Sequence, residues 1–301
     1  MKLATTTGDF LSYTDSQTES IKCIHAAGFK YVDYNFDWDF EHSCGVFSAD
    51  WKSHIDDVLK TADSLGMTFI QAHSPTGKPI TKDENYENFI FGTKRCIECC
   101  AILGIKNLVV HSGYIQDISK DECFDLNKAF YLDLLHFAEK YDVNILVENF
   151  NKMHIDGMYW IDNAADQRAM IDYVDHPLFH ACWDAGHGNM QETTQDEALR
   201  TLGEHVYALH VQDNMGNHDS HMAPYFGTLN MDSLMHGLID IGYKGYFTFE
   251  SGNIFLPARY RRPYDKDTRL NRAPLPLRIS AEKLLYDIGK YTLDAYNMYE
   301  E

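Results

Sequence analysis

Basic side chains are scarce in this sequence relative to acidic ones. The 301 residues include 26 Lys and Arg against 45 Asp and Glu, which gives a formal net charge of −19. A chain with this balance repels the phosphates of nucleic acids and the anionic headgroups of membranes. We therefore expect neither nucleic acid nor a membrane surface as a partner.

Long apolar runs and paired cysteine motifs are also missing. The N-terminus, MKLATTTGDF, has no long apolar core, and no run approaches the ~20 apolar residues of a membrane span. We expect neither a signal peptide nor a membrane-spanning helix. The seven cysteines include one CxxC, within CIECC at 96–100, and no second one. An odd number of cysteines in a long chain suits a reducing cytoplasm better than a disulfide framework, so we expect a cytoplasmic protein.

One unit repeats along the chain: a short strand-like run that ends in polar residues, followed by a stretch with helical spacing. Glycine follows several of the helical stretches, where helices commonly stop. The predicted strands are 2–8, 31–36, 68–73, 107–113, 144–149, 180–187, 207–213 and 246–251. The predicted helices are 15–27, 49–65, 84–103, 121–141, 161–175, 192–204, 230–241 and 279–297.

The alternation of strand and helix predicts parallel strands joined by helical crossovers. Eight such units in ~300 residues match a closed (β/α)₈ barrel, the TIM barrel, in count and length. The competing interpretation is an open doubly wound sheet, which usually carries a glycine-rich phosphate turn after its first strand. The corresponding stretch here, TTTGDF, is not such a turn. We predict an α/β fold of the (β/α)₈ type, with residues 1–301 forming one domain.

The ends of the predicted strands carry a repeated chemical signal. Each strand from the third onward ends in or near a carboxylate or an imidazole, and the active site of a barrel lies at these ends. Two of the strands, ending in VENF and FTFES, finish apolar runs with a glutamate. The candidate residues are His73, His111, Glu148, Asp184, His187, His210, Asp213, Asp219, His221 and Glu250.

A shared cation explains why buried strands end on charged groups, because it compensates carboxylates that are costly to desolvate alone. Carboxylate and imidazole together suit Mn²⁺, Mg²⁺, Co²⁺, Fe²⁺ or Zn²⁺. We predict one divalent metal ion, Mn²⁺, Co²⁺, Mg²⁺ or Zn²⁺. From their residue types alone, His73 and His111 are substrate hydrogen-bond donors, supports of the ligands or further ligands.

The sequence resembles the xylose-isomerase-like TIM-barrel superfamily from about the third strand to the eighth. The resemblance is carried by LVENF, CWDAGH, ALHVQDN, HDSHMAPYFGTLNM and GYKGYFTFES. It implies an isomerase, a ketose epimerase or aldose–ketose isomerase, that acts on a small sugar or sugar phosphate. It also implies that the metal is held by Glu148, Asp184, His210 and Glu250, that both glutamates act as acid and base, and that His187 contacts substrate. A homo-oligomer is a further implication.

An alternative within the same resemblance is an endonuclease IV-like phosphodiester hydrolase with three zinc ions. Its ligand pattern matches nine residues here, including Asp219 and His221 as ligands beyond the four named above. The net charge of −19 argues against it, because DNA binding requires a cationic surface. We favour the isomerase.

The expected reaction begins with proton abstraction next to a carbonyl. The metal would act as a Lewis acid that stabilises an enediolate, while Glu148 and Glu250 remove and return the proton. Epimerisation, isomerisation and dehydration remain open.

An Arg-rich loop, 252–278, is predicted after the eighth strand. Arginine suits bidentate contact with anions, so Arg259 is a candidate contact to a substrate phosphate or carboxylate. Pairing of this loop with the acidic surface or with another subunit is the alternative.

Overall fold

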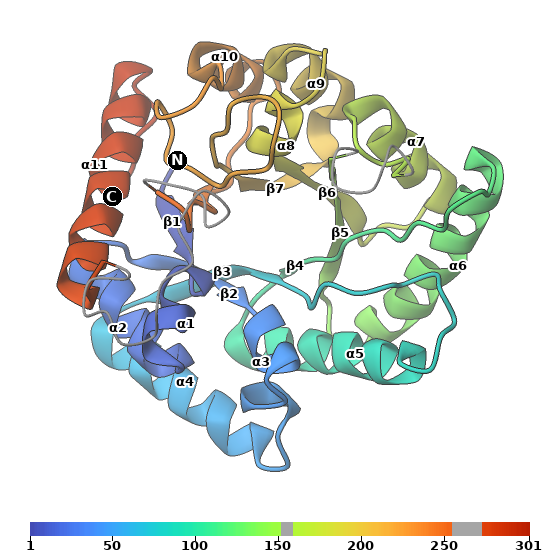
Figure 1. The fold of residues 1–301 in the computed structure, drawn as a ribbon, viewed down its shortest axis with the longest axis horizontal. Helices are drawn as coiled ribbons and strands as arrows, with labels where there is room; N and C mark the ends of the chain where they lie inside the picture. Colours follow the sequence, from blue (N-terminus) through green and yellow to red (C-terminus); the bar gives the residue numbers. More distant parts are fainter. Residues whose placement is uncertain (152–158, 255–272) are drawn as a thin grey trace, which may run out of the picture.

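The computed structural model describes residues 1–151, 159–254 and 273–301 of the chain. Its centre is an eight-stranded parallel sheet in the order β7-β6-β5-β4-β3-β2-β1-β8 (Figure 1). The strands are β1 (Leu3–Thr6), β2 (Tyr31–Asn35), β3 (Thr68–His73), β4 (Asn107–Val109), β5 (Asn144–Glu148), β6 (Phe179–Asp184), β7 (Val206–His210) and β8 (Phe247–Phe249).

The sheet closes on itself between β7 and β8. Val211, just after β7, forms a parallel bridge with Phe249. The Val211 amide donates to the Thr248 carbonyl at 2.8 Å, and the Glu250 amide donates to the Val211 carbonyl at 3.1 Å. The predicted (β/α)₈ barrel is therefore confirmed.

Helices surround the barrel and cover the outer face of every strand (Figure 1). The helices are α1 (Gly8–Thr14), α2 (Gln17–Ala27), α3 (Asp37–Glu41), α4 (Trp51–Leu65), α5 (Tyr86–Leu103), α6 (Lys120–Ala138), α7 (Ala164–Val174), α8 (Ala185–Asn189), α9 (Gln195–Leu202), α10 (Met231–Asp240) and α11 (Leu275–Ala295), with 3₁₀ turns η1 (Gly45–Phe47) and η3 (Gly203–His205). All eight predicted helices are present.

Two kinds of local signal set the helix ends: serine caps at their starts and the expected glycines at their stops. Ser16 and Ser119 accept hydrogen bonds from backbone amides of the first turns of α2 and α6, which satisfies donors that the helix itself leaves unpaired. Gly28 and Gly66 follow α2 and α4 with φ of 105° and 65°, a conformation that costs glycine little. Several predicted strands are shorter than expected: 2–8 is confined to Leu3–Thr6, 107–113 to Asn107–Val109 and 246–251 to Phe247–Phe249, and 207–213 ends at His210. The predicted strand 180–187 ends at Asp184 because α8 begins there.

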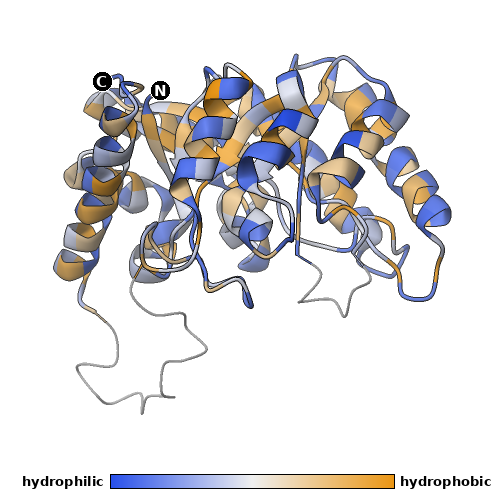
Figure 2. Ribbon diagram, turned by 90° about the horizontal axis from the view of Figure 1, so that it is seen from above, coloured by the Kyte–Doolittle hydropathy of each residue, from blue (hydrophilic) through white to orange (hydrophobic). Residues whose placement is uncertain are grey.

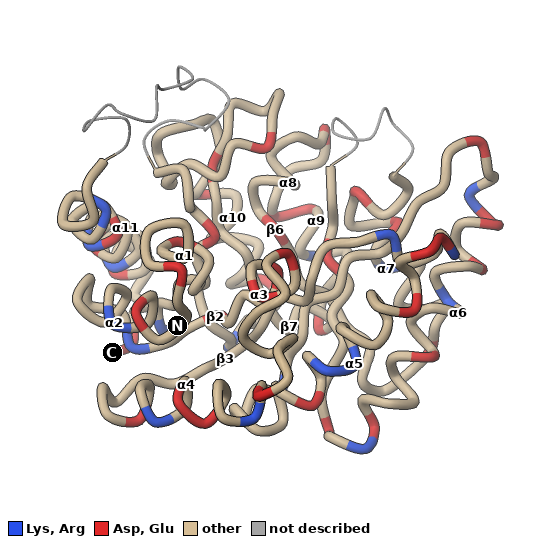
Figure 3. The backbone as a smooth tube through the Cα atoms, turned by 60° about the horizontal axis from the view of Figure 1, so that its bottom comes forward, with Lys and Arg blue, Asp and Glu red and all other residues tan. Residues whose placement is uncertain are grey.

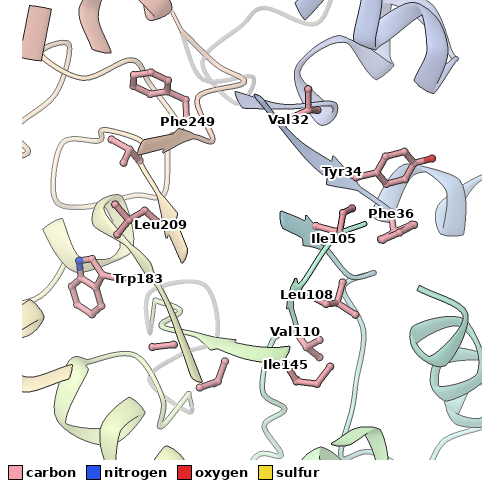
Figure 4. Packing of buried hydrophobic residues seen from close by; sticks show 14 of the residues in the cluster. Val32, Tyr34, Phe36, Ile105, Leu108, Val110, Ile145, Trp183, Leu209 and Phe249 are labelled. Carbon is pink, nitrogen blue, oxygen red and sulfur yellow. The ribbon is translucent and has the colours of Figure 1, made fainter. Parts of the chain in front are cut away.

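The outward faces of the strands pack against the helices. Figure 4 shows Tyr34, Trp183 and Phe249 directed away from the barrel axis, and all three are fully buried. Trp183 ends under α9, where its indole nitrogen donates to Gln195 Oε1 at 2.8 Å. The helices present hydrophilic residues outward and hydrophobic ones inward (Figure 2), the pattern typical of helices packed on a core.

A smaller apolar layer fills part of the barrel interior. It consists of Val109, Leu146, Cys182 and Ala208, one residue from each of β4 to β7, and all are buried. Because side chains alternate along a strand, each of these residues lies on the same face as the residue two positions later. Those later residues are His111, Glu148, Asp184 and His210.

Acidic residues predominate on the outer helices, with Lys and Arg interspersed (Figure 3). None of the helices in the described part of the chain is long and apolar enough to cross a membrane. All seven cysteines are free thiols. Cys96, Cys99 and Cys100 are buried on α5 and belong to the hydrophobic core, so the CIECC group packs this helix against the barrel.

The predicted Arg-rich loop, 252–278, falls only partly on described residues. Positions 255–272, which include Arg259, lie outside them. Residues 275–278 form the first turn of α11. Arg278 is buried there and donates to Glu282 at 2.7 Å, so its guanidinium is held within the fold.

Candidate active site

Four of the predicted metal ligands converge at the C-terminal ends of their strands. Glu148 ends β5, Asp184 ends β6, His210 ends β7, and Glu250 follows β8. Each offers one oxygen or nitrogen, and these four atoms all lie within 4.8 Å of one another. That spacing allows all four atoms to contact a single ion.

Glu148 is the centre of the cluster. It is buried, and His210 Nδ1 lies 2.8 Å from its Oε1, while His111 Nε2 and His73 Nε2 lie 2.9 and 3.3 Å from its Oε2. Burial opposes ionisation, but His210 and the two other imidazoles outweigh it and hold the pKa of Glu148 well below its usual range. His73 and His111 thus lie against the Glu148 carboxylate, 3.2 Å from each other.

Asp184 is held through its backbone and through one carboxylate oxygen, Oδ1, which accepts from the His187 amide at 2.6 Å. The Asn149 side chain accepts from the Asp184 amide at 2.8 Å and donates to the Asp184 carbonyl at 3.0 Å. The carboxylate is fully buried, and its Oδ2 has no hydrogen-bond partner. Burial raises the pKa of Asp184 to about 7. Such a buried, unsatisfied oxygen fits a ligand to a cation, because the cation would supply the missing compensation.

A second cluster adjoins the first and consists of His187, Asp219 and His221. His187 Nε2 lies 3.0 Å from Asp219 Oδ2, and His221 Nε2 lies 3.2 Å from Asp219 Oδ1. One atom of each residue lies within 4.8 Å of the others. His221 Nδ1 is 3.7 Å from Glu250 Oε2, so the two clusters are in contact.

Two amides missed by the sequence analysis tie these carboxylates together. Gln212 Nε2 donates to Asp219 Oδ1 at 2.8 Å and reaches Asp184 Oδ1 at 3.3 Å. Asn149 brackets the backbone of Asp184 as described above. Both lie at the ends of predicted strands, 144–149 and 207–213, and their adjacency to Glu148 and Asp213 was the available signal.

Asp33 is the most consequential residue that the sequence analysis missed. It lies on β2, is buried, and places Oδ2 3.1 Å from His210 Nε2. Gln71 Nε2 on β3 donates to the same oxygen at 2.9 Å. Since Asp33 contacts one ring nitrogen, the other, Nδ1, faces Glu148 and Glu250. A carboxylate behind a ligating histidine commonly fixes its tautomer and orientation.

Asp213 has a local role. Its carboxylate accepts hydrogen bonds from the backbone amides of Asn214, Gly227 and Leu229 at 2.8 to 2.9 Å. These bonds pin the two ends of the β7–α10 loop together. Asp213 therefore shapes the segment that carries Asp219 and His221.

Glu148 and Glu250 line a cavity of about 190 Å³ at the mouth of the barrel. His73, His111 and His187 line it as well, and Phe150 adds an aromatic face whose centroid lies 5.0 Å from that of each of His111 and His187. The expected substrate contacts therefore surround the two glutamates, apart from Arg259, which lies outside the described residues.

The residues present fit a divalent cation. Three carboxylates and one imidazole meet at one point, and hard or borderline divalent metals prefer this mixture. Asp184 Oδ2 is the orphaned oxygen that such an ion would satisfy.

Comparison with known proteins gives a consistent assignment. A family model described as a xylose isomerase-like TIM barrel matches residues 21–263. The chain is 26% identical over 132 residues to fructoselysine 3-epimerase from Escherichia coli O157:H7. The aligned region covers 43% of this chain and 47% of that protein. This match thus spans about half the length of that relative.

Solved structures show the same fold. A D-tagatose 3-epimerase-like protein matches with a TM-score of 0.76 at 19% identity, over 99% of this chain and 98% of that one. An AP endonuclease, family 2, from Brucella melitensis matches with a TM-score of 0.67 at 15% identity, over 83% of this chain and 93% of that one.

Proposed function

The chain belongs to the xylose isomerase-like TIM-barrel family, and on that premise we propose that it is a divalent-metal-dependent isomerase of a sugar or sugar phosphate, a ketose epimerase or aldose–ketose isomerase. One observation carries the proposal: Glu148, Asp184, His210 and Glu250 place ligand atoms within 4.8 Å of one another, and both glutamates line a cavity. The 3-epimerase names of a relative and of a structural neighbour support it.

Glu148 and Glu250 are the proposed acid and base. They come from strands separated by β6 and β7, so they approach a bound sugar from different directions. One carboxylate takes the proton from the carbon beside the carbonyl, and the other returns it. Return to the opposite face of the same carbon gives epimerisation, while return to the neighbouring carbon gives isomerisation.

The remaining residues hold the reacting groups in place. Glu148, Asp184, His210 and Glu250 are the proposed ligands of one divalent ion, with Mn²⁺, Co²⁺, Mg²⁺ and Zn²⁺ as candidates. When bound, the ion would polarise the sugar oxygens and offset the negative charge that develops as the proton leaves. His73, His111 and His187 line the cavity and are proposed to bind substrate hydroxyls.

Proton exchange provides the direct test. The purified protein is incubated in D₂O with a panel of ketoses, aldoses and their phosphates, with and without EDTA, and deuterium incorporation beside the carbonyl is followed by NMR. We expect exchange with at least one sugar, its loss in EDTA, and its recovery with Mn²⁺ or Co²⁺. No metal-dependent exchange on any sugar would refute the proposal.

A phosphodiester hydrolase is the second candidate, and the His187, Asp219 and His221 cluster beside the first one favours it. The net charge of −19 opposes it, because nucleic acid must be attracted to the mouth. Metal analysis separates the two: about one ion per chain accords with the isomerase, whereas three Zn²⁺ ions per chain and nicking of abasic DNA accord with the hydrolase.

We further propose a reducing, cytoplasmic location. All seven cysteines are free, and six of them are buried, an arrangement that suits a compartment in which thiols stay reduced. Cell extracts prepared with an alkylating agent, which traps free thiols at lysis, provide the test. Disulfide bonds found in the protein from such extracts would contradict this location. A homo-oligomer, implied by the family resemblance, is testable by light scattering.

A further inference from the structure

A second cavity lies beside the one that Glu148 and Glu250 line. Its volume is about 300 Å³, and its wall shares Asn35, His221 and Glu250 with the first. The first cavity, at about 190 Å³, is smaller than the roughly 300–1,000 Å³ typical of small-molecule sites. A molecule whose reacting carbons lie between the two glutamates can therefore continue past Glu250 into the second cavity.

The far wall of the second cavity is built by the end of β1 and by α1. Thr6, Asp9 and Ser12 line it. Asp9 is only 5% exposed. Its Oδ2 lies 3.0 Å from the Thr5 hydroxyl, and its Oδ1 lies 3.6 Å from Arg278 Nη2. The wall thus presents a carboxylate that is held rigidly by the barrel and by α11.

The charge behind this wall is not positive. Arg278 donates to Glu282 at 2.7 Å, and Glu282 is fully buried beside it. One guanidinium therefore faces two carboxylates, and burial together with Glu282 raises the pKa of Asp9 well above its usual range. Among the described residues that line the cavity there is no Lys or Arg, so nothing in this part of the chain compensates a bound anion.

We propose that the second cavity is a subsite for a non-anionic, hydrogen-bond-donating extension of the sugar, either a glycosyl group or an amine, and that it discriminates against a phosphate there. The inference rests on the proposed sugar chemistry at Glu148 and Glu250. Hydroxyl and ammonium groups can donate to the Asp9 carboxylate and to the Asn253 side-chain oxygen. A phosphate offers mainly acceptors and carries negative charge, which no Lys or Arg among the described lining residues would compensate.

Gly252 keeps Asp9 open to this cavity. A Cβ at position 252 would lie 3.2 Å from Asp9 Oδ1, which is tighter than an ordinary contact. Gly252 is not among the glycines with positive φ, so its backbone accepts alanine. Gly252→Ala therefore narrows the approach to Asp9 by a single methyl group.

A matched series of C6 derivatives tests the subsite. The compounds are a ketohexose that the enzyme turns over, its 6-phosphate, its 6-amino-6-deoxy analogue and its 6-O-glucosyl derivative; for fructose the last is isomaltulose. We expect kcat/KM for the glucosyl or the amino compound to exceed that for the 6-phosphate about tenfold or more. The compound with the higher kcat/KM shows whether the extension that the subsite binds is a glycosyl group or an amine.

Variants locate the effect. Gly252→Ala is expected to lower the ratio of kcat/KM for the favoured extended compound over the free ketohexose about tenfold. Asp9→Asn replaces one carboxyl oxygen by an amide donor and should also lower this ratio, and Asp15→Asn, an exposed change at the end of α1, is the matched control. Because Asp9 also pairs with Arg278, the circular dichroism spectrum of Asp9→Asn must match that of the wild type before its kinetics are compared. If the spectra differ, the test relies on Gly252→Ala.

The subsite and the proposed function can fail separately. If no sugar is turned over, the proposed function fails, and calorimetric Kd values for isomaltulose and fructose 6-phosphate on the wild type and Gly252→Ala still test the subsite. Preference for the phosphate, or an unchanged ratio in Gly252→Ala, would overturn the subsite.

Discussion

The two halves of the barrel interior are built differently beneath the candidate site. Under β4 to β7 the layer is apolar, formed by Val109, Leu146, Cys182 and Ala208. Under β8, β2 and β3 it is a chain of buried hydrogen bonds: Thr248 donates to Gln71 at 3.2 Å, and Gln71 donates to Asp33 at 2.9 Å.

The comparison shows two ways of holding functional groups. In the apolar half, packing of the buried layer fixes the strands. Because side chains alternate along a strand, Glu148, Asp184 and His210 lie on the same face as the layer residues two positions before them. In the polar half, Asp33 reaches across the barrel to His210 and fixes its ring. The first half therefore contributes mainly stability, and the second contributes mainly orientation.

The largest expected effect is a fall in kcat when either of the two glutamates is substituted. Glu148→Gln and Glu250→Gln should each lower kcat by about 10²–10⁴-fold, because each removes a group that exchanges a proton with the substrate. Glu204→Gln, the same change at an exposed position of η3, should leave kcat unchanged. Activity within threefold of wild type in either glutamate variant would show that the acid and base lie elsewhere.

The apolar half is tested by Leu146→Ala. This change leaves a cavity below Glu148, and we expect it to lower the free energy of unfolding by about 2–5 kcal/mol. Urea denaturation measures the loss, and Leu277→Ala, at a side chain that is 58% exposed, should have little effect. A cost below 1 kcal/mol for Leu146→Ala would mean that this layer contributes little.

The polar half is tested by Asp33→Asn. The amide keeps the shape but removes the charge behind His210, so we expect metal affinity to fall about 10–100-fold, with a smaller loss of stability than in Leu146→Ala. Competition with a chromophoric chelator measures the affinity. Asp56→Asn, an exposed change on α4, is the control. Unaltered metal affinity would remove the orienting role of Asp33.

The smallest effect is the labelling of Cys182, which reports whether solvent reaches the apolar layer. Burial raises the pKa of the Cys182 thiol to about 12, and thiols react as thiolates. In native protein at pH 8, N-ethylmaleimide should modify the partly exposed Cys44 while Cys182 stays unmodified, as mass spectrometry can show. Equal labelling rates would indicate that water reaches the layer beneath Asp184.

Most of the fold followed from the sequence because its signals are local. Helical spacing and stopping glycines predicted every long helix, and short strand-like runs predicted every strand. Strand ends likewise predicted the groups that meet at the mouth, since strands that are parallel neighbours must bring their ends to one rim. The short helices α1, α3 and α8 were missed because each is a single turn or two within a loop.

The missed site residues depend on contacts across the barrel. Asp33 and His210 are 177 positions apart, and Asp33 lies inside the strand YVDYN rather than at its end. Nothing in the local pattern of β2 distinguishes a carboxylate that supports a histidine from one that faces solvent.

The sequence by itself determined the eight repeating units, the ring of strand-end carboxylates and imidazoles, and the acidic charge of the whole chain. Only the tertiary structure decided that four candidate ligand atoms lie within 4.8 Å of one another, that Asp33 contacts His210, and that a second polar cavity opens past Glu250. The physical reason is that alternation and helical period are properties of neighbouring residues, whereas distances between strands are set only when the barrel closes and its interior packs.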